Sequence, residues 1–212
     1  MNNNELFELY DREYLSVIFE KRDAWFKTYL NIDLVKFQKE MSDAIITHFL
    51  DEDWWRVFWK SSRQTWKSTV ILWTIIFIWT FLKEILPQYD NWKNMNIWFS
   101  VPKLEQAYQN FFEIKNILKK LKEDGIIEKP EKDNMDKIVL SNWTTFYIFS
   151  LAEGTSNQSK TLALSIVDEA QDINYEKYRK EIEPMLATTN WTQVFIWVGS
   201  YVDNTFYRVV NW

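Results

Sequence analysis

Residues 61–69 read Ser-Ser-Arg-Gln-Thr-Trp-Lys-Ser-Thr and follow a short strand-like segment. The pattern is close to the P-loop consensus G-x-x-x-x-G-K-[ST], whose backbone N–H groups surround nucleotide phosphates while the Lys contacts the phosphates and the hydroxyl binds Mg²⁺. Lys67 and Ser68 match this consensus. Trp66 does not, because the position before the Lys normally holds glycine so that bare backbone can approach a phosphate. The stretch therefore predicts a nucleotide site that contains one conflicting residue.

Tryptophan and glycine occur in unusual proportions along the whole chain. The sequence contains 13 Trp and 3 Gly, whereas ordinary glycine usage of about 7% predicts roughly 15 glycines at this length. Asn-Gly is a strong turn signal because both residues accept positive φ, and Asn-Trp has no such basis. We hypothesise that most Trp positions stand for Gly, through a codon such as UGA that the source reads as glycine. The alternative is a genuinely tryptophan-rich chain, and the codons of the gene decide between the two. Four tryptophans directly follow asparagine: Asn91-Trp92, Asn142-Trp143, Asn190-Trp191 and Asn211-Trp212.

Composition excludes several kinds of chemistry. The 212 residues include no Cys and a single His, which excludes disulfides, thiol catalysis and zinc sites built on these residues. His48 falls on the apolar side of an expected helix, so we expect it to pack rather than to catalyse. The apolar run over residues 70–82 is too short for a membrane span and predicts a buried helix. Because the N-terminus has no signal sequence, we expect a soluble intracellular protein.

The charge of the chain gives no general indication of nucleic-acid binding. The net charge is −5, so a DNA contact would need a local basic patch. Residues 115–122 contain four lysines and are the candidate for such a patch. A solvated helix face is the alternative explanation.

The apolar pattern predicts alternating helices and strands in an α/β fold. Continuous apolar strands between helices predict a mostly parallel sheet covered by helices on both faces, with the ligand at the carboxyl ends of the strands. Pro102 suits a first helical position, Gly125 suits the position after that helix, and residues 128–137 predict a charged surface loop. We expect helices over residues 5–30, 33–50, 67 to before 87, 104–121 and 175–186. We expect strands over residues 56–58, 96–101, 137–140, 144–151, 162–167 and 192–198.

A second motif follows the expected strand at residues 162–167. The apolar run ends in Asp168-Glu169, as in a Walker B element, where Asp168 would hold Mg²⁺ and Glu169 would orient the attacking water. An acidic pair after an apolar run also occurs at the start of an ordinary solvated loop. The spacing of about 100 residues from the P-loop favours a P-loop NTPase of the RecA/ASCE type, preceded by N-terminal helices.

The ordered motifs resemble those of the large terminase subunit of tailed bacteriophages, the ATPase that packages DNA. The likeness covers about residues 33–212 and rests on the P-loop, on residues 96–102, on residues 142–154, on the Walker B segment 166–172 and on residues 183–200. Two positions depart from the pattern of the family. Ser61 replaces the first glycine of the P-loop, and Ser200-Tyr201 replaces the Thr-Pro that is often seen at the end of the segment over residues 183–200. A superfamily 1 helicase core shares the Asp-Glu-Ala-Gln-Asp box and is the alternative. If Trp66 is genuine, an inactive pseudo-ATPase binding module is preferred.

The resemblance implies a role for each site residue. Gln38 would bind adenine through its amide. The equal alternative is that Gln38 is an exposed helix residue with no role in binding. Arg63 would act as an arginine finger or, alternatively, pair with a surface carboxylate. Thr189 or Ser200 would couple phosphate release to motion, with strand-end capping as the simpler reading. The residues implied in ATP and Mg²⁺ binding are Ser62, Arg63, Gln64, Thr65, Trp66, Lys67, Ser68, Thr69 and Asp168, with Glu169 and Arg63 as the catalytic pair.

The same resemblance implies an organisation and partners. Residues 1–32 would be a helical appendage and residues 33–212 the ATPase domain, with no nuclease domain in this chain. The implied partners are double-stranded DNA, the portal and the small terminase subunit, in a homo-oligomeric ring in the host cytoplasm. No membrane association is expected.

Overall fold

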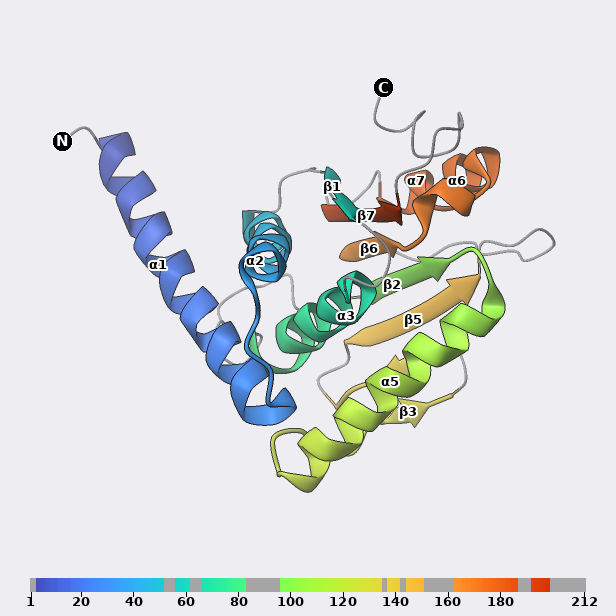
Figure 1. The fold of residues 1–212 in the computed structure, drawn as a ribbon, viewed down its shortest axis with the longest axis horizontal. Helices are drawn as coiled ribbons and strands as arrows, with labels where there is room; N and C mark the ends of the chain where they lie inside the picture. Colours follow the sequence, from blue (N-terminus) through green and yellow to red (C-terminus); the bar gives the residue numbers. More distant parts are fainter. Residues whose placement is uncertain are drawn as a thin grey trace.

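The fold is a seven-stranded sheet with helices packed against it. The computed structural model describes residues 3–51, 56–61, 66–82, 96–134, 137–141, 144–150, 162–186 and 192–198. Figure 1 shows the arrangement of the elements along the chain. In order, these are α1 (Asn3–Trp25), η1 (Phe26–Leu30), α2 (Lys36–Asp51), β1 (Arg56–Ser61), α3 (Lys67–Phe77), η2 (Ile78–Leu82), β2 (Asn96–Val101), α5 (Leu104–Glu123), β3 (Lys132–Asp133), β4 (Lys137–Val139), β5 (Thr145–Ser150), β6 (Leu164–Val167), η4 (Ala170–Asp172), α6 (Tyr175–Glu181), α7 (Glu183–Leu186) and β7 (Thr192–Val198).

The sheet is parallel except at one edge. The strand order is β1-β7-β6-β2-β5-β4-β3, and the first five strands pair in parallel. Strands β3 and β4 join antiparallel beside β5. The central strands are apolar on both sides because helices cover both faces, as parallel sheets require. The predicted mostly parallel α/β fold is therefore confirmed.

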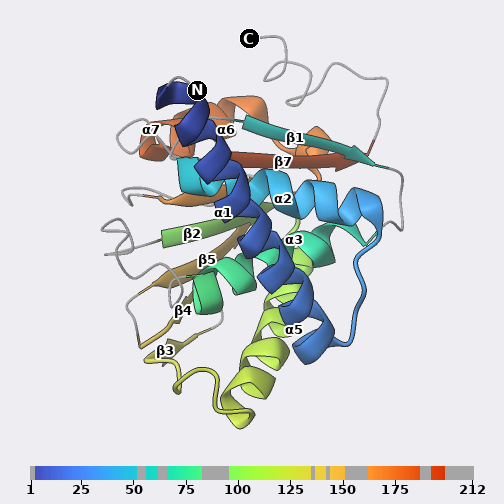
Figure 2. The same cartoon turned by 90° about the vertical axis from the view of Figure 1, so that its left-hand side faces the viewer.

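Each face of the sheet has its own hydrophobic core. Ile97 and Phe99 of β2 belong to the larger cluster, which also contains residues of α1, α2, α3 and α5. The alternate residue Trp98 belongs to the second cluster, with Tyr178 and Ile182 beside α6. Figures 1 and 2 show α2, α3 and α5 on the same side of the sheet. The two-residue period of a strand thus assigns neighbouring side chains to opposite cores.

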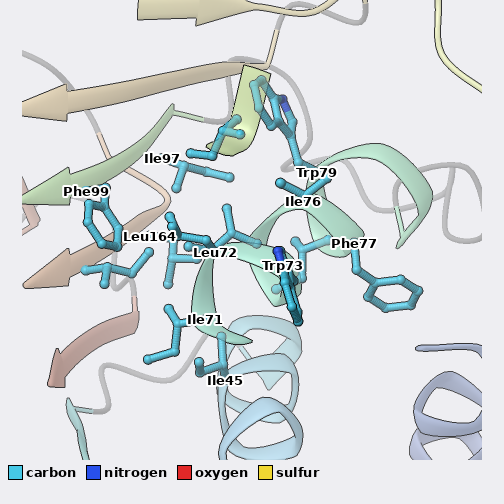
Figure 3. Close-up of a cluster of buried hydrophobic side chains, with 14 of the residues drawn as sticks. Ile45, Ile71, Leu72, Trp73, Ile76, Phe77, Trp79, Ile97, Phe99 and Leu164 are labelled. Carbon is cyan, nitrogen blue, oxygen red and sulfur yellow. The ribbon is translucent and has the colours of Figure 1, made fainter. Parts of the chain in front are cut away.

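Helix α3 is the centre of the larger core. Every residue from Val70 to Thr80 is buried. Figure 3 shows Leu72 near Leu164 of β6, Ile76 on the side of Ile97 of β2, and Ile71 beside Ile45 of α2. The hydroxyls of Thr74 and Thr80 donate to the carbonyls one turn earlier, which satisfies these polar groups inside the core. The prediction of a buried helix is confirmed, and no helix in the described ranges has both the length and the hydropathy to cross a bilayer.

Several predicted boundaries differ from the structure. The helix after β2 begins at Leu104 rather than at Pro102, because strand pairing continues through Val101 and Lys103 remains extended. The predicted loop over residues 128–137 contains β3, a short edge strand. Its residues are charged, so the sequence did not predict that it pairs with β4. The predicted helix over residues 175–186 is divided between α6 and α7, where Pro184 lacks a backbone N–H. Gly125 is confirmed as the residue after α5, with φ at 72°.

A buried arginine connects α1 to α2. Arg22 is 1% exposed, and its guanidinium pairs with Asp43 of α2 and, at 2.8 Å, with Asp23. Lys39 Nζ lies 2.5 Å from Asp23 Oδ2. Burial raises the pKa of Asp43, and the Arg22 guanidinium beside it acts in the opposite direction. The N-terminal helix is therefore attached by charge as well as by the apolar residues Ile18 and Phe26, which lie in the main core.

We expect Arg22→Ala to destabilise the protein. Removing the guanidinium leaves Asp43 without its cation, and because that carboxylate is partly exposed we expect a loss of about 2 kcal/mol in the free energy of unfolding. Urea unfolding measures this quantity. Lys36→Ala is the control, because Lys36 is 91% exposed and forms only a long surface ion pair. Equal stability of the two variants would contradict the role assigned to Arg22.

Candidate active site

The two predicted nucleotide motifs meet at the carboxyl edge of the sheet. Strand β1 ends at Ser61 and leads to α3, which begins at Lys67. Strand β6 ends at Val167 and is followed at once by Asp168. Strand β7 lies between β1 and β6 and pairs in parallel with both. Because all three strands point the same way, the residues that follow β1 and β6 lie at one edge.

A hydrogen bond joins the two motifs directly. Ser68 Oγ donates to Asp168 Oδ2 at 2.6 Å, between residues that are 100 positions apart in the chain. The other carboxylate oxygen of Asp168 accepts the backbone N–H of Glu169 at 2.9 Å, and the backbone N–H of Asp168 donates to the carbonyl of Ser100 at 2.9 Å. These bonds hold the carboxylate in place. The hydroxyl and the carboxylate are oxygen ligands of the kind that Mg²⁺ prefers, and they are side by side.

Burial changes the acidity of this carboxyl group. Asp168 is 5% exposed. Burial raises the pKa of Asp168 from 3.8 to about 6, partly offset by the Ser68 hydrogen bond; Glu169 raises the pKa further and Lys67 lowers it. A cation bound beside Asp168 would favour the ionised form.

Lys67 is a buried ammonium group with too few partners. Its Nζ lies 3.5 Å from Glu169 Oε1, an ion-pair distance that is too long for a good hydrogen bond. Within the described part of the chain this nitrogen has no hydrogen-bond partner, although Lys67 is only 6% exposed. A buried ammonium is costly without acceptors, so the position fits a ligand that carries negatively charged oxygens.

Glu169 is held from both sides. Its Oε1 faces Lys67, and its Oε2 accepts a hydrogen bond from Gln171 Nε2 at 2.6 Å. The same amide nitrogen lies 3.2 Å from Asp172 Oδ2. Glu169 also has left-handed backbone, with φ at 50°, which is uncommon for a residue with a long side chain. No sequence pattern predicted this role for Gln171; the only signal was an amide two residues after the acidic pair.

Trp66 has the backbone conformation of a glycine. Its φ and ψ are 57° and 21°, in the left-handed region, and its carbonyl accepts the N–H of Val70 at 2.9 Å to begin α3. Its side chain is 64% exposed. Left-handed backbone costs a residue other than glycine about 1–2 kcal/mol. The structure therefore supports the sequence argument that this position suits glycine.

The other described tryptophans have no such backbone. Among the described residues, Trp66 is the only tryptophan with positive φ. The Asn-Trp pairs, together with Trp54 and Trp55, lie outside the described residues, so the hypothesis of recoded glycines stays a prediction about the gene. Buried positions in helices or strands are taken by Trp25, Trp73, Trp79, Trp98 and Trp197.

The remaining predicted site residues are placed only in part. Gln38 Oε1 accepts the backbone N–H of Val35 at 3.0 Å, so its amide caps the first turn of its own helix. That turn lies toward the same edge as the carboxyl end of β1 (Figure 2). Thr69 is half-buried in the first turn of α3. The residues that fall outside the described ranges are Ser62, Arg63, Gln64, Thr65, Thr189 and Ser200.

Comparison with known proteins identifies similar structures but no similar sequences. Neither a protein-family model nor a curated protein matches the chain. The large terminase of bacteriophage HK97 is similar in structure, with a TM-score of 0.69 and 16% identity over 91% of this chain and 40% of that one. The large terminase ATPase domain of Thermus phage P74-26 gives a TM-score of 0.60 and 18% identity over 86% of this chain and 71% of that one.

A third likeness concerns a structure with bound nucleotide. The large terminase of a thermophilic bacteriophage, solved in complex with ADP, gives a TM-score of 0.52 and 14% identity over 74% of this chain and 38% of that one. The chain thus spans about 40% of the HK97 protein. At these identities the comparison concerns the fold, which this chain shares with bacteriophage large terminase ATPase domains.

Proposed function

We propose that this chain is the ATPase domain of a bacteriophage DNA-packaging terminase large subunit, which hydrolyses ATP to translocate double-stranded DNA. The observation that carries the proposal is the hydrogen bond from Ser68 to Asp168, which unites a P-loop hydroxyl and a Walker B carboxylate at the edge where this fold binds ligands. The portal, the small terminase subunit and further copies of the chain in a ring are the proposed partners.

The residues of the cluster divide the chemistry among them. Lys67 would contact the β- and γ-phosphates, where its ammonium group would gain the hydrogen-bond acceptors that the described residues do not supply. Ser68 and Asp168 would hold Mg²⁺, which when bound neutralises phosphate charge. Glu169 would accept a proton from the attacking water once Lys67 turns toward phosphate, and Gln171 would keep the carboxylate oriented. Arg63 would stabilise charge in the transition state, as arginine fingers do.

One observation favours a second candidate function. Trp66 directly precedes Lys67, and its indole is exposed. If the gene encodes tryptophan there, a non-hydrolysing binding module becomes the better explanation. No comparable observation favours a helicase.

We expect Mg-ATP to bind the Trp66→Gly variant and not the chain with Trp66. Glycine adopts the left-handed backbone without strain and leaves the phosphate approach open. Isothermal titration with Mg-ATP measures both chains. Trp66→Gly combined with Lys67→Ala is the matched control and should not bind. Tight binding by the chain that retains Trp66 would refute this account of the loop.

In the Trp66→Gly background, we expect Glu169→Gln to abolish hydrolysis while leaving ATP binding intact. Loss of a general base typically lowers the rate by about 10²–10⁴-fold. A phosphate-release assay measures turnover, and the titration above measures affinity. Glu176→Gln, at an exposed site on α6, should retain full activity. A Glu169→Gln variant with normal turnover would remove Glu169 from the mechanism.

Asp168→Asn should change how stability depends on pH. Folding raises the pKa of the Asp168 carboxyl group from 3.8 to about 6. Between these two pH values the folded state therefore binds more protons than the unfolded state. The favourable contribution of this carboxyl group is lost as pH rises through about 6, and the ionised form costs the folded state about 3 kcal/mol. Relative to the parent chain, the variant should gain about 2 kcal/mol between about pH 4.5 and about pH 7.5, because about 1 kcal/mol of the difference is already present at the lower pH.

Urea unfolding at the two pH values tests this expectation. Asp172→Asn is the control, because Asp172 is exposed in the same loop, and it should follow the parent chain at both pH values. An Asp168→Asn variant that also follows the parent chain would show that the carboxyl group is not buried in solution.

A further inference from the structure

A cleft lies between α5 and the segment that leads into β3 and β4. Its volume is about 290 Å³. The charged residues that line it are Lys115, Lys119, Lys122, Lys129 and Asp133. Four cations therefore face one carboxylate, in a chain whose net charge is −5. Such a local excess of positive charge attracts anions even when the protein as a whole repels them.

Two of these lysines are already paired and two are not. Lys115 Nζ lies 2.5 Å from Asp133 Oδ1, and Lys119 Nζ lies 3.9 Å from Glu123 Oε1 at an exposed site. Lys122 and Lys129 form no ion pair with any acidic residue in the part of the chain that the structure describes. Two ammonium groups on the cleft are thus available to a ligand at no cost in internal pairs.

The lysines of α5 form a line along one face of the helix. Lys115, Lys119 and Lys122 are spaced by four and three residues, which places them on one side of an α-helix, about 6 Å and about 4.5 Å apart along its axis. Lys120 is not part of the line, because its ammonium donates to the carbonyl of Tyr29. Of the four lysines over residues 115–122, three therefore face the cleft and one is structural.

Two exposed aromatic residues continue the same face toward the start of α5. Tyr108 and Phe112 are 41% and 66% exposed, and they precede Lys115 at helical spacing. We call this face, with the cleft, the lysine face; it comprises Tyr108, Phe112, Lys115, Lys119, Lys122 and Lys129. Two large aromatic side chains are thus left open to water beside the row of cations.

The lysine end of this face is separate from the nucleotide site. Helix α5 follows β2 at the carboxyl edge of the sheet and runs back across it, so its last turns lie near the opposite edge. Figure 1 shows the end of α5 far from the points of the β2 and β5 arrows. A ligand of the cleft would not compete with ATP.

We propose that the lysine face binds the phosphate backbone of double-stranded DNA. The choice of DNA rests on the proposed function, while the choice of a repeating phosphate rests on the geometry. A single phosphate would use one or two cations, whereas a row of lysines about 6 Å and about 4.5 Å apart along the helix axis can contact several phosphates of a polymer with a negative charge about every 3.4 Å along each strand. Lysine side chains contact such phosphates without reading sequence.

Fluorescence anisotropy with a labelled duplex of mixed sequence tests the proposal. The Lys122→Ala/Lys129→Ala double variant removes only the lysines without internal pairs, so its melting temperature should equal that of the parent chain. We expect DNA affinity to fall about tenfold. The slope of log K against log salt between about 50 and 200 mM should become shallower by about 2, since each lost phosphate contact removes about 0.9.

The matched control is Lys36→Ala/Lys180→Ala. It changes the net charge equally, at exposed sites on α2 and α6, and should leave DNA affinity within about twofold of the parent value. If both double variants weaken binding equally, the effect is one of total charge and the proposal is overturned. Unchanged affinity in Lys122→Ala/Lys129→Ala, or no binding by the parent chain at low salt, would also overturn it.

Two further measurements distinguish DNA binding from binding of other anions and from ATP binding at the candidate active site. If free ATP, or an acidic polypeptide such as polyglutamate, displaces the duplex at an equal concentration of charges, the face is not specific for DNA and the proposal fails. Mg-ATP titration of Trp66→Gly with and without Lys122→Ala/Lys129→Ala should give the same affinity. Loss of ATP binding in both would count against the proposed ATPase, whereas the anisotropy data bear on the lysine face alone.

Discussion

The geometry of the candidate site depends on the hydrogen bond between Ser68 and Asp168. This bond joins residues 100 positions apart, and it forms because β1, β7 and β6 are parallel neighbours whose carboxyl ends share an edge. The apolar strands and α3, which is buried from Val70 onward, fix that edge, since neither can shift without exposing its core face to water. The helix that fills the main core is also the helix that carries Lys67 and Ser68, so packing and chemistry depend on the same element.

Charge in the site is incompletely balanced. One buried ammonium, on Lys67, faces the carboxylates of Asp168 and Glu169, and burial disfavours ionisation of Asp168. A phosphate would supply acceptors to Lys67, and a divalent cation would stabilise ionised Asp168. The site therefore has the electrostatics of a receptor for an anion and a cation together. The lysine end of the lysine face lies away from it, near the other edge of the sheet, so α5 spans the distance between the candidate nucleotide site and the proposed DNA contact.

At Trp66, local chemistry and fold disagree within the site. The fold requires left-handed backbone before Lys67, and the residue there is among the least suited to it. Local rules usually fail at functional positions because function sets the geometry. Here the backbone of Trp66 is that of a glycine and the side chain is not, which is why the identity of this residue bears directly on the proposed binding of ATP. Glu169 shares the unusual backbone but has a partner on each carboxylate oxygen.

The sequence alone determined the strands over residues 96–101 and 192–198, the buried helix and the end of α5 at Gly125, because burial period and glycine backbone are local properties. The motifs also predicted a metal site at Ser68 and Asp168; the structure places the two side chains within hydrogen-bond distance, and the metal stays a prediction. Tertiary structure decided the rest. The position of β7 between β1 and β6, the pairing of β3, the contact of Gln171 with Glu169 and the separation of Lys120 from the other lysines all depend on which segments pack side by side. Local pattern records whether a residue is buried, and only the packed chain determines what it is buried against.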